Sequence, residues 1–296
     1  CVDRKSQFGK FTGSSKRLDR KDPTSIEARC LHMFRYLVLS NMCPNVTLLY
    51  KYFLCEDIYN LSRGTSEDNI FKTLTEQSLK KTIRPHAMVL ISEYASLGSL
   101  RAWRMNTKST TEQWRSILFQ IIYTLAVVQD IMEFRHNDLH QANILLDSCD
   151  DSEKCLKYTI MGINFYVKHA GIYVRMWDFD WCYSQNYLEN NKVLLGKSSV
   201  DKNTTRHFDL HRLLNHVYCS EKGAIPKEVR KFIKNIYPDE YLGRDSNQLK
   251  SYRLRKDADF SRIPTPVTLI KHPFFYDFLE KKDHVVPEYT YELGTN

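Results

Sequence analysis

The chain has 296 residues, of which 42% are hydrophobic and 26% are charged, a composition typical of a globular protein with one large or two modest domains. The formal net charge of +8 favours an anionic partner such as a nucleotide or an acidic protein, but no motif of interleaved aromatic and basic residues supports nucleic-acid binding. No uninterrupted apolar run reaches the roughly 18 residues that a membrane span requires. The eight cysteines include no Cys-x-x-Cys pair, which favours reduced thiols in a cytoplasmic compartment.

The first third of the chain predicts one helix and a few strands. Apolar residues recur at helical spacing within 22–39, which predicts a helix. Residues 45–55 are rich in Val, Leu, Tyr and Phe and predict one or two strands, whereas 61–84 are polar and predict a loop. Residues 86–94, "HAMVLISEY", predict a buried strand, which ends in the turn-prone "ASLGSL".

The composition then changes, and helical patterns dominate. Residues 110–132 predict the strongest helix, because their apolar residues follow the i, i+3, i+4, i+7 spacing closely. A short strand is predicted at 142–148, hairpin strands at 157–181 around two glycines, and a long loop at 183–206. The last part predicts helices at 208–218 and 227–237, then a proline-rich turn with a short helix at 264–281.

The stretch "FRHNDLHQANILL", residues 134–146, allows three interpretations. His136 and His140 have the i, i+4 spacing of a helical metal site, but no glutamate accompanies them and the stretch runs into a strand. Asn and Asp also favour turns, in which a histidine is satisfied by its polar neighbours. The third interpretation is phosphoryl transfer, which needs a carboxylate that orients the attacking hydroxyl and oxygen ligands for Mg²⁺. Asp138 supplies the carboxylate, and Asn143 with Asp178, which follows a strand, supplies the oxygen ligands.

These residues resemble the eukaryotic-like protein kinase family. "HNDLHQAN" is similar to its His-Arg-Asp-Leu-x-x-x-x-Asn catalytic loop, and "DFD" at 178–180 stands where the family has Asp-Phe-Gly. "VLISEYASLGSL" resembles the hinge, "HFDLHRLLN" the buried helix after the activation segment, and "PTPVTLIKHPFF" the end of the large lobe. More narrowly, "DPTSIEARCLHMFRYLV" and "GINFYVKHAGIYVRMWDFDW" resemble serine/threonine kinases of large nucleocytoplasmic DNA viruses, which implies a viral protein of the host cytoplasm or the virion.

The resemblance implies an α+β, two-lobed protein-kinase-like fold. Its small β-rich lobe would occupy 1–94, and its larger, mainly α-helical lobe 95–296. No Gly-x-Gly-x-x-Gly loop and no strand lysine occur near the start, so the small lobe is expected to be truncated, with both features upstream of Cys1. The interval between Asp138 and Asp178 is longer than most family members have, which is explained by an extended hairpin at 150–175.

The resemblance also implies the roles of the site residues. Asp138 would be the catalytic base, with His140 donating to the γ-phosphate, and Asn143 and Asp178 would bind Mg²⁺, with Mn²⁺ as an alternative ion. The remaining roles are hinge contacts to adenine from Glu93 and Ala95, a gatekeeper Ser92, a lysine-pairing Glu27, and structural support from His136, Phe179 and Asp209. Glu27 fits equally the N3 position of a capping box that begins at Thr24.

Three departures from the family pattern qualify this interpretation. Asn137 replaces the arginine that contacts a phosphorylated activation loop, which argues against that form of regulation. His140 replaces a lysine, as in haspin-like and small-molecule kinases, and Asp180 replaces the glycine, which leaves that backbone less free.

The expected function is transfer of the γ-phosphoryl group of Mg-ATP to Ser or Thr hydroxyls of proteins. The alternatives are a small-molecule kinase of the same fold and a non-catalytic pseudokinase that acts as a binding module.

Overall fold

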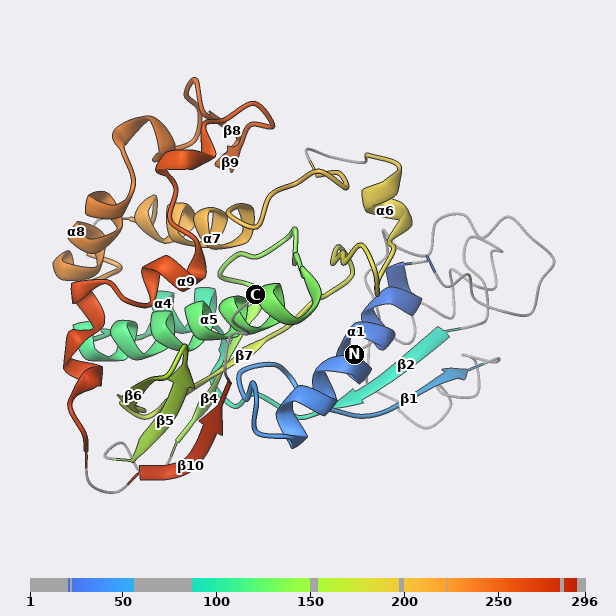
Figure 1. Ribbon diagram of the computed structural model, residues 1–296, viewed down its shortest axis with the longest axis horizontal. Helices are drawn as coiled ribbons and strands as arrows, with labels where there is room; N and C mark the ends of the chain where they lie inside the picture. The colour runs from blue at the N-terminus through green and yellow to red at the C-terminus, as the bar shows by residue number, and fades with distance from the viewer. Residues whose placement is uncertain are drawn as a thin grey trace.

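The computed structural model is shown in Figure 1. It describes residues 21, 23–55, 87–149, 154–196, 200–221, 223–282 and 285–291. The polar stretch 61–84 and the start of the chain lie outside these residues, so the loop prediction and the front of the small lobe have no structural counterpart here.

The first described elements are one helix and a two-stranded sheet. Helix α1, Pro23–Leu39, packs beside β1, Leu49–Cys55, and β2, Ala87–Ser92, which pair antiparallel (Figure 1). The predicted helix and strands are thus confirmed, but the prediction that β2 is buried is wrong. Leu90 is buried while Ile91 is 44% exposed, because alternate strand residues face opposite sides and α1 covers one of them.

Helix α5, Thr111–Met132, is the central helix of the part of the molecule that follows β2, which we call the large part. It begins at a capping box in which Thr110 and Gln113 bond each other's backbone N–H groups, and it is buried along most of its length. Within the described residues it is the one helix that is long and apolar enough to cross a membrane. The sequence showed no uninterrupted apolar run of that length. In the structure, 83% of the most apolar window of α5 is buried inside the protein. Its Gln120 bonds Asn45 and the backbone of Val174, which fixes the helix to the sheet beside it.

Two small sheets pack against the same side of α5 (Figure 1). The first has the order β3-β4-β7, with β3 at Gly98–Ser99, β4 at Ile144–Ser148 and β7 at Ile172–Met176. The second has the order β10-β5-β6, with β5 at Cys155–Ile160, β6 at Ile163–Lys168 and β10 at Val285–Thr290. The β5–β6 hairpin is inserted between β4 and β7, which confirms the extended hairpin. Strand β10, parallel to β5, was not predicted.

Helices α7, Phe208–Tyr218, and α8, Lys227–Ile236, lie on the side of α5 away from these sheets (Figure 1), and further short elements complete the molecule. Helix α4, Leu100–Asn106, was not predicted; Ser99 caps it by accepting from the N–H of Ala102. The predicted helices are confirmed as α7 and α8. The other short elements are α6 (Asn191–Leu194), α9 (Pro266–Leu269), β8 (Leu249–Lys250), β9 (Arg253–Leu254), η1 (Asp239–Tyr241), η2 (Phe260–Arg262) and η3 (Pro273–Leu279).

Four cysteines of the described part, Cys30, Cys43, Cys182 and Cys219, are free thiols, in agreement with the expectation of reduced cysteines. Burial raises the pKa of Cys43 to about 12, so this thiol stays protonated and unreactive at neutral pH.

Helix α7 contains a buried histidine that should make the fold acid-sensitive. His211 is fully buried, its Nε2 lies 2.7 Å from the carbonyl oxygen of Tyr241, and burial lowers its pKa from 6.5 to about 4. Protonation therefore favours the unfolded state, and the contribution is present above pH 6.5 and lost as the pH falls towards 4. We expect a loss of roughly 3 kcal/mol of unfolding free energy, measured by denaturant titration at pH 7 and pH 4.5. The variant His211→Gln retains the donor to Tyr241 but does not titrate, so a pH dependence identical to that of the unmodified protein would contradict this assignment.

Candidate active site

The β4–β7 pairing brings two predicted ligand residues to one end of a sheet. Ile144 pairs with Met176, and the N–H of Trp177 donates to the carbonyl of Asn143 at 3.0 Å. Asn143 stands just before β4 and Asp178 two residues after β7, and the strands are antiparallel. Both side chains therefore belong to the same end of this sheet, although they come from separate segments.

Helix α7 holds the loop that contains the catalytic-loop motif. The buried carboxylate of Asp209 accepts hydrogen bonds of 2.7 Å from the backbone N–H groups of both His136 and Asn137. Burial raises the pKa of Asp209, against the opposing effects of His136 and these two bonds. The carboxylate fixes the backbone directly before Asp138.

A second residue of α7, Arg212, binds the same loop. Its Nη1 lies 2.5 Å from Oδ1 of Asp138 and donates to the carbonyl of Asn137 at 3.0 Å. Asn137 has φ 63°, in the left-handed region that non-glycine residues seldom adopt, so bonds at both its N–H and its carbonyl hold a strained conformation. Burial alone raises the pKa of Asp138, but the neighbouring guanidinium of Arg212, with a smaller effect of His140, outweighs it and holds this pKa below its usual value.

The other oxygen of Asp138 faces Asn143 and His140. Asn143 donates from Nδ2 to the carbonyl of Asp138 at 3.1 Å and lies 3.5 Å from its Oδ2. Nε2 of His140 is 3.6 Å from Oδ2, while its Nδ1 accepts from the N–H of Ala142 at 3.3 Å. Nε2 therefore carries the proton of the neutral ring and directs it towards the carboxylate. Burial lowers the pKa of His140, so this ring is neutral at pH 7.

The "DFD" segment is packed against the catalytic loop. Phe179 is fully buried, with ring centroids 5.0 Å from Phe34 of α1 and 5.2 Å from His136. The Nε2 of His136 lies 2.9 Å from the carbonyl oxygen of Trp177. Asp178 has φ 66°, a strained conformation of the kind that clusters at functional sites.

Asp180 forms a buried ion pair beside this segment. Its Oδ2 lies 2.7 Å from Nζ of Lys192 in α6, and its side chain is 4% exposed. Burial and the nearby carboxylates of Asp178 and Asp138 raise its pKa to about 6, so the three carboxylates lie in one neighbourhood. The left-handed residue of this turn is Asp178, and the structure assigns no positive φ to Asp180, which explains how an aspartate is accommodated where the family has glycine.

The Lys192–Asp180 pair should contribute strongly to stability. We expect Lys192→Met to cost about 3 kcal/mol or more of unfolding free energy, because it leaves a buried carboxylate without its cation. The variant Lys192→Met/Asp180→Asn should recover most of that loss, since it also removes the charge. Chemical denaturation measures both values. Equal losses in the single and the double variant would contradict the proposed ion pair.

The predicted nucleotide-contacting residues lie at the end of β2 and on α1. Ser92 ends β2, and the N–H of Glu93 bonds the carbonyl of Leu48. The Glu93 carboxylate accepts from the N–H of Leu48 at 2.7 Å and lies 2.8 Å from Nε of Arg175, so it has a structural role. The buried Ala95 accepts from Gly98 through its carbonyl.

Glu27 lies on the buried face of α1 and is 7% exposed. Because α1 begins at Pro23, Thr24 is already helical, and the capping-box interpretation that placed it at the N-cap is wrong. The strand lysine expected to pair with Glu27 lies outside the described residues.

The metal interpretation of the two histidines is not supported. Among the residues that the structure describes, no group of three or more His, Cys, Asp or Glu side chains is arranged to hold a metal ion. His136 is also fully buried and its Nε2 is used by Trp177.

Sequence reasoning missed the residues that surround Asp138 from the C-terminal half. Arg212 contacts Asp138 directly, and Nη2 of Arg253 in β9 lies 3.6 Å from the same Oδ1. His216 of α7 packs against His140 with ring centroids 6.5 Å apart. Only Arg212 had a signal in the sequence, because its spacing of three from Asp209 places both residues on one face of α7.

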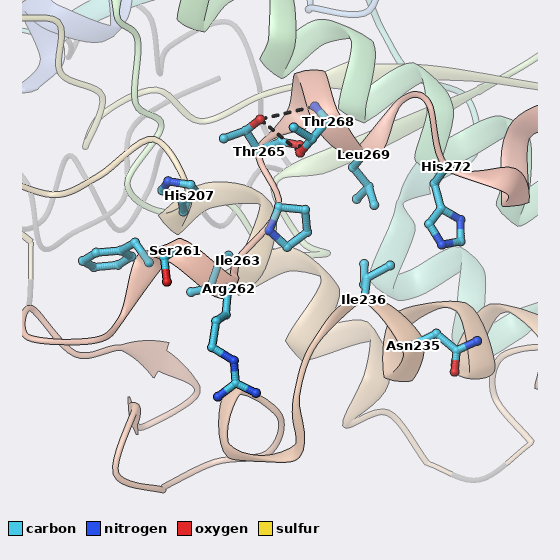
Figure 2. Close-up of a pocket in the computed structure, with 12 residues that line it drawn as sticks. His207, Asn235, Ile236, Ser261, Arg262, Ile263, Thr265, Thr268, Leu269 and His272 are labelled. Atoms are coloured by element: carbon cyan, nitrogen blue, oxygen red, sulfur yellow. Dashed lines mark hydrogen bonds between the residues drawn. The ribbon is translucent and has the colours of Figure 1, made fainter.

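Away from this site, the end of α8, η2 and α9 line a hollow of about 770 Å³, whose lining residues are shown in Figure 2. None of the predicted site residues lines it. His207 at its wall stacks on Phe260 with ring centroids 5.8 Å apart.

The chain resembles named kinases over most of its length. It is 27% identical over 293 residues to the "Putative serine/threonine-protein kinase R400" of Acanthamoeba polyphaga mimivirus, covering 91% of this chain and 61% of that protein. It is 38% identical over 110 residues to the "Putative serine/threonine-protein kinase R301" of the same virus, covering 34% of this chain and 28% of that protein. The chain thus spans about three fifths of the first relative and less of the second.

Among solved structures, the Rad53 kinase domain is similar over 85% of this chain and 82% of that chain, with 15% identity and a TM-score of 0.40. No family model matches the chain. The described residues form a mixed α/β fold, and the geometry of the loop at Asp138 agrees with the resemblance to protein kinases. The chain is thus similar to proteins named as serine/threonine-protein kinases, at 27% identity over most of its length and at 38% over a shorter stretch. The division into lobes at 1–94 and 95–296 stays a prediction.

Proposed function

We propose that this protein is an enzyme that transfers the γ-phosphoryl group of ATP to serine or threonine hydroxyls of proteins. The observation that supports it best is the convergence of Asp138, Asn143 and Asp178, from two chain segments, at a loop that α7 fixes through Asp209 and Arg212. The similarity to proteins named as kinases supports the reaction class, and transfer of this kind depends mainly on positioning and charge neutralisation.

Asp138 is the group that would orient the acceptor hydroxyl and accept its proton. Its side chain is 22% exposed, so a substrate can reach it, and Arg212 occupies one of its two oxygens. The second oxygen lies on the side of Asn143 and His140, which places the reactive oxygen towards the proposed phosphate site. Arg212 thus acts as a positioning residue for the base.

Asn143 and Asp178 fit a Mg²⁺ or Mn²⁺ ion. Asn143 donates its amide N–H to Asp138, so its amide oxygen is directed elsewhere, and Asp178 adds a carboxylate at the same end of the sheet. One amide and one carboxylate suit an ion that keeps phosphate and water as its other ligands. When bound, the ion would neutralise charge on the phosphates.

The remaining contacts to the nucleotide come from the chain on either side of the site. The proton on Nε2 of His140 would be donated to the γ-phosphate. Backbone groups of Glu93 and Ala95 would bind adenine beside Ser92, which the resemblance places at the gatekeeper position. Glu27 would pair with the lysine that binds the α- and β-phosphates.

The rival functions are separated by one set of assays on the complete protein. Labelled ATP is supplied with mixed protein substrates, or with choline and amino sugars as small alcohols. Label on phosphoserine or phosphothreonine supports the proposal, and label confined to a small alcohol would show the small-molecule kinase, which His140 favours by its resemblance. Binding of ATP without transfer to any acceptor would show the pseudokinase.

A further inference from the structure

Two adjoining hollows run from the catalytic loop across the large part of the molecule. The first, of about 410 Å³, has His140 and Gln141 of the catalytic loop in its wall, together with His216 of α7. The second, of about 800 Å³, lies between the α4–α5 connection and the α7–α8 connection. Arg104 and Glu221 line both, so the two hollows are neighbours, and together we call them the basic groove.

The charge of the basic groove is strongly one-sided. Among its described lining residues, Glu221 is the single acid, and the cations are Arg101, Arg104, Lys108 and Lys227. Arg101, Lys108 and Lys227 are exposed, so their charges face solvent at the groove. The groove therefore presents a net positive field next to the loop that contains Asp138.

The groove is rigidly connected to the catalytic loop. Nε of Arg104 donates to Oε1 of Gln141 at 2.8 Å, and the N–H of Arg101 donates to the carbonyl of Gln141 at 3.0 Å. At the catalytic end, Nε2 of His140 is 3.6 Å from the carboxylate of Asp138. A polypeptide with its hydroxyl at Asp138 can therefore continue past His140 into the groove.

We propose that the basic groove binds an acidic segment of the protein substrate and so selects serine or threonine acceptors that have aspartate or glutamate close by in the sequence. This inference deepens the proposed function and rests on it. The cations are spread over α4, the α4–α5 connection and the start of α8, which suits successive carboxylates of an extended peptide, whereas a single phosphate is bound by donors that converge.

The test compares peptides with one acceptor serine and flanking residues that are either glutamate or its neutral isostere glutamine. For the unmodified protein at low ionic strength, we expect kcat/KM to be about tenfold higher for the glutamate peptide, mainly through a lower KM. The variant Arg101→Glu/Lys108→Glu should abolish this ratio. The control Lys231→Glu/Lys271→Glu makes the same change in net charge at exposed positions that do not line the groove, and it should retain the ratio.

Failure of the groove and failure of the proposed function give different results. The glutamate peptide with alanine in place of serine is labelled, and its binding is measured by fluorescence anisotropy, which needs no phosphoryl transfer. Binding that Arg101→Glu/Lys108→Glu removes and the control retains supports the groove even if no peptide is phosphorylated. Equal binding of glutamate and glutamine peptides by the unmodified protein, or an unchanged preference in the groove variant, would overturn the inference.

Discussion

Asp138→Asn is expected to lower phosphoryl transfer by at least about 100-fold, because it removes the group that accepts the hydroxyl proton. The size of the amide matches that of the carboxylate, so the loop should keep its shape. The measurement is the initial rate of labelled phosphate transfer at saturating ATP. Activity equal to that of the unmodified protein would refute the assignment of the base.

The stability of that variant needs its own control, because Arg212 is buried and would lose its anion. We expect Asp138→Asn to cost up to about 3 kcal/mol of unfolding free energy, as in other buried pairs that lose one partner. The double variant Asp138→Asn/Arg212→Met removes the isolated cation and should recover stability without recovering activity. Recovery of activity together with stability would show that the single variant was merely unfolded.

Arg212→Met is the second change with a large expected effect. It removes the cation from Asp138 and the donor from the strained Asn137, so the loop is free to relax and the carboxylate to rotate. A displacement of about 1 Å in a reacting group can cost about 100-fold in rate, so we expect a fall in kcat of that order with little change in the KM for ATP. Arg212→Lys should restore part of the activity, since it retains the charge.

The matched control for Arg212 is Arg230→Met. Arg230 is also partly buried and donates to the backbone carbonyls of Tyr218, Ser220 and Glu221, which lie outside the catalytic loop. The variant Arg230→Met should have a lower free energy of unfolding, but its folded molecules should keep the kcat of the unmodified protein. A fall in kcat as large as that of Arg212→Met would show that any lost arginine in this region disturbs the site.

The elements that sequence reasoning predicted well are those with a strong local period. Helices α1, α5 and α7 repeat apolar residues every three to four positions, and the catalytic loop is recognisable because its residues lie within one short stretch. Even there, the spacing did not predict that the buried Phe34 of α1 packs against Phe179.

The features that were missed depend on contacts between distant segments. Strand β10 pairs with β5, from which it is far removed in the sequence. Helix α4 is too short to show a helical period. The ion pair between Arg212 and Asp138 is likewise set by how α7 packs beneath the loop, so the sequence showed a helix face but not its partner. Tertiary packing, and not local propensity, determines these positions.

The most direct test of the assembled site is ATP binding by calorimetry, with and without Mg²⁺. The account predicts that Mg²⁺ strengthens ATP binding by the unmodified protein and by Asp138→Asn, and that Asp178→Asn removes most of this strengthening while the protein remains folded. Mg²⁺-dependent binding that is undiminished in Asp178→Asn would show that Asp178 does not serve the nucleotide site, and the convergence of Asp138, Asn143 and Asp178 would then have another purpose.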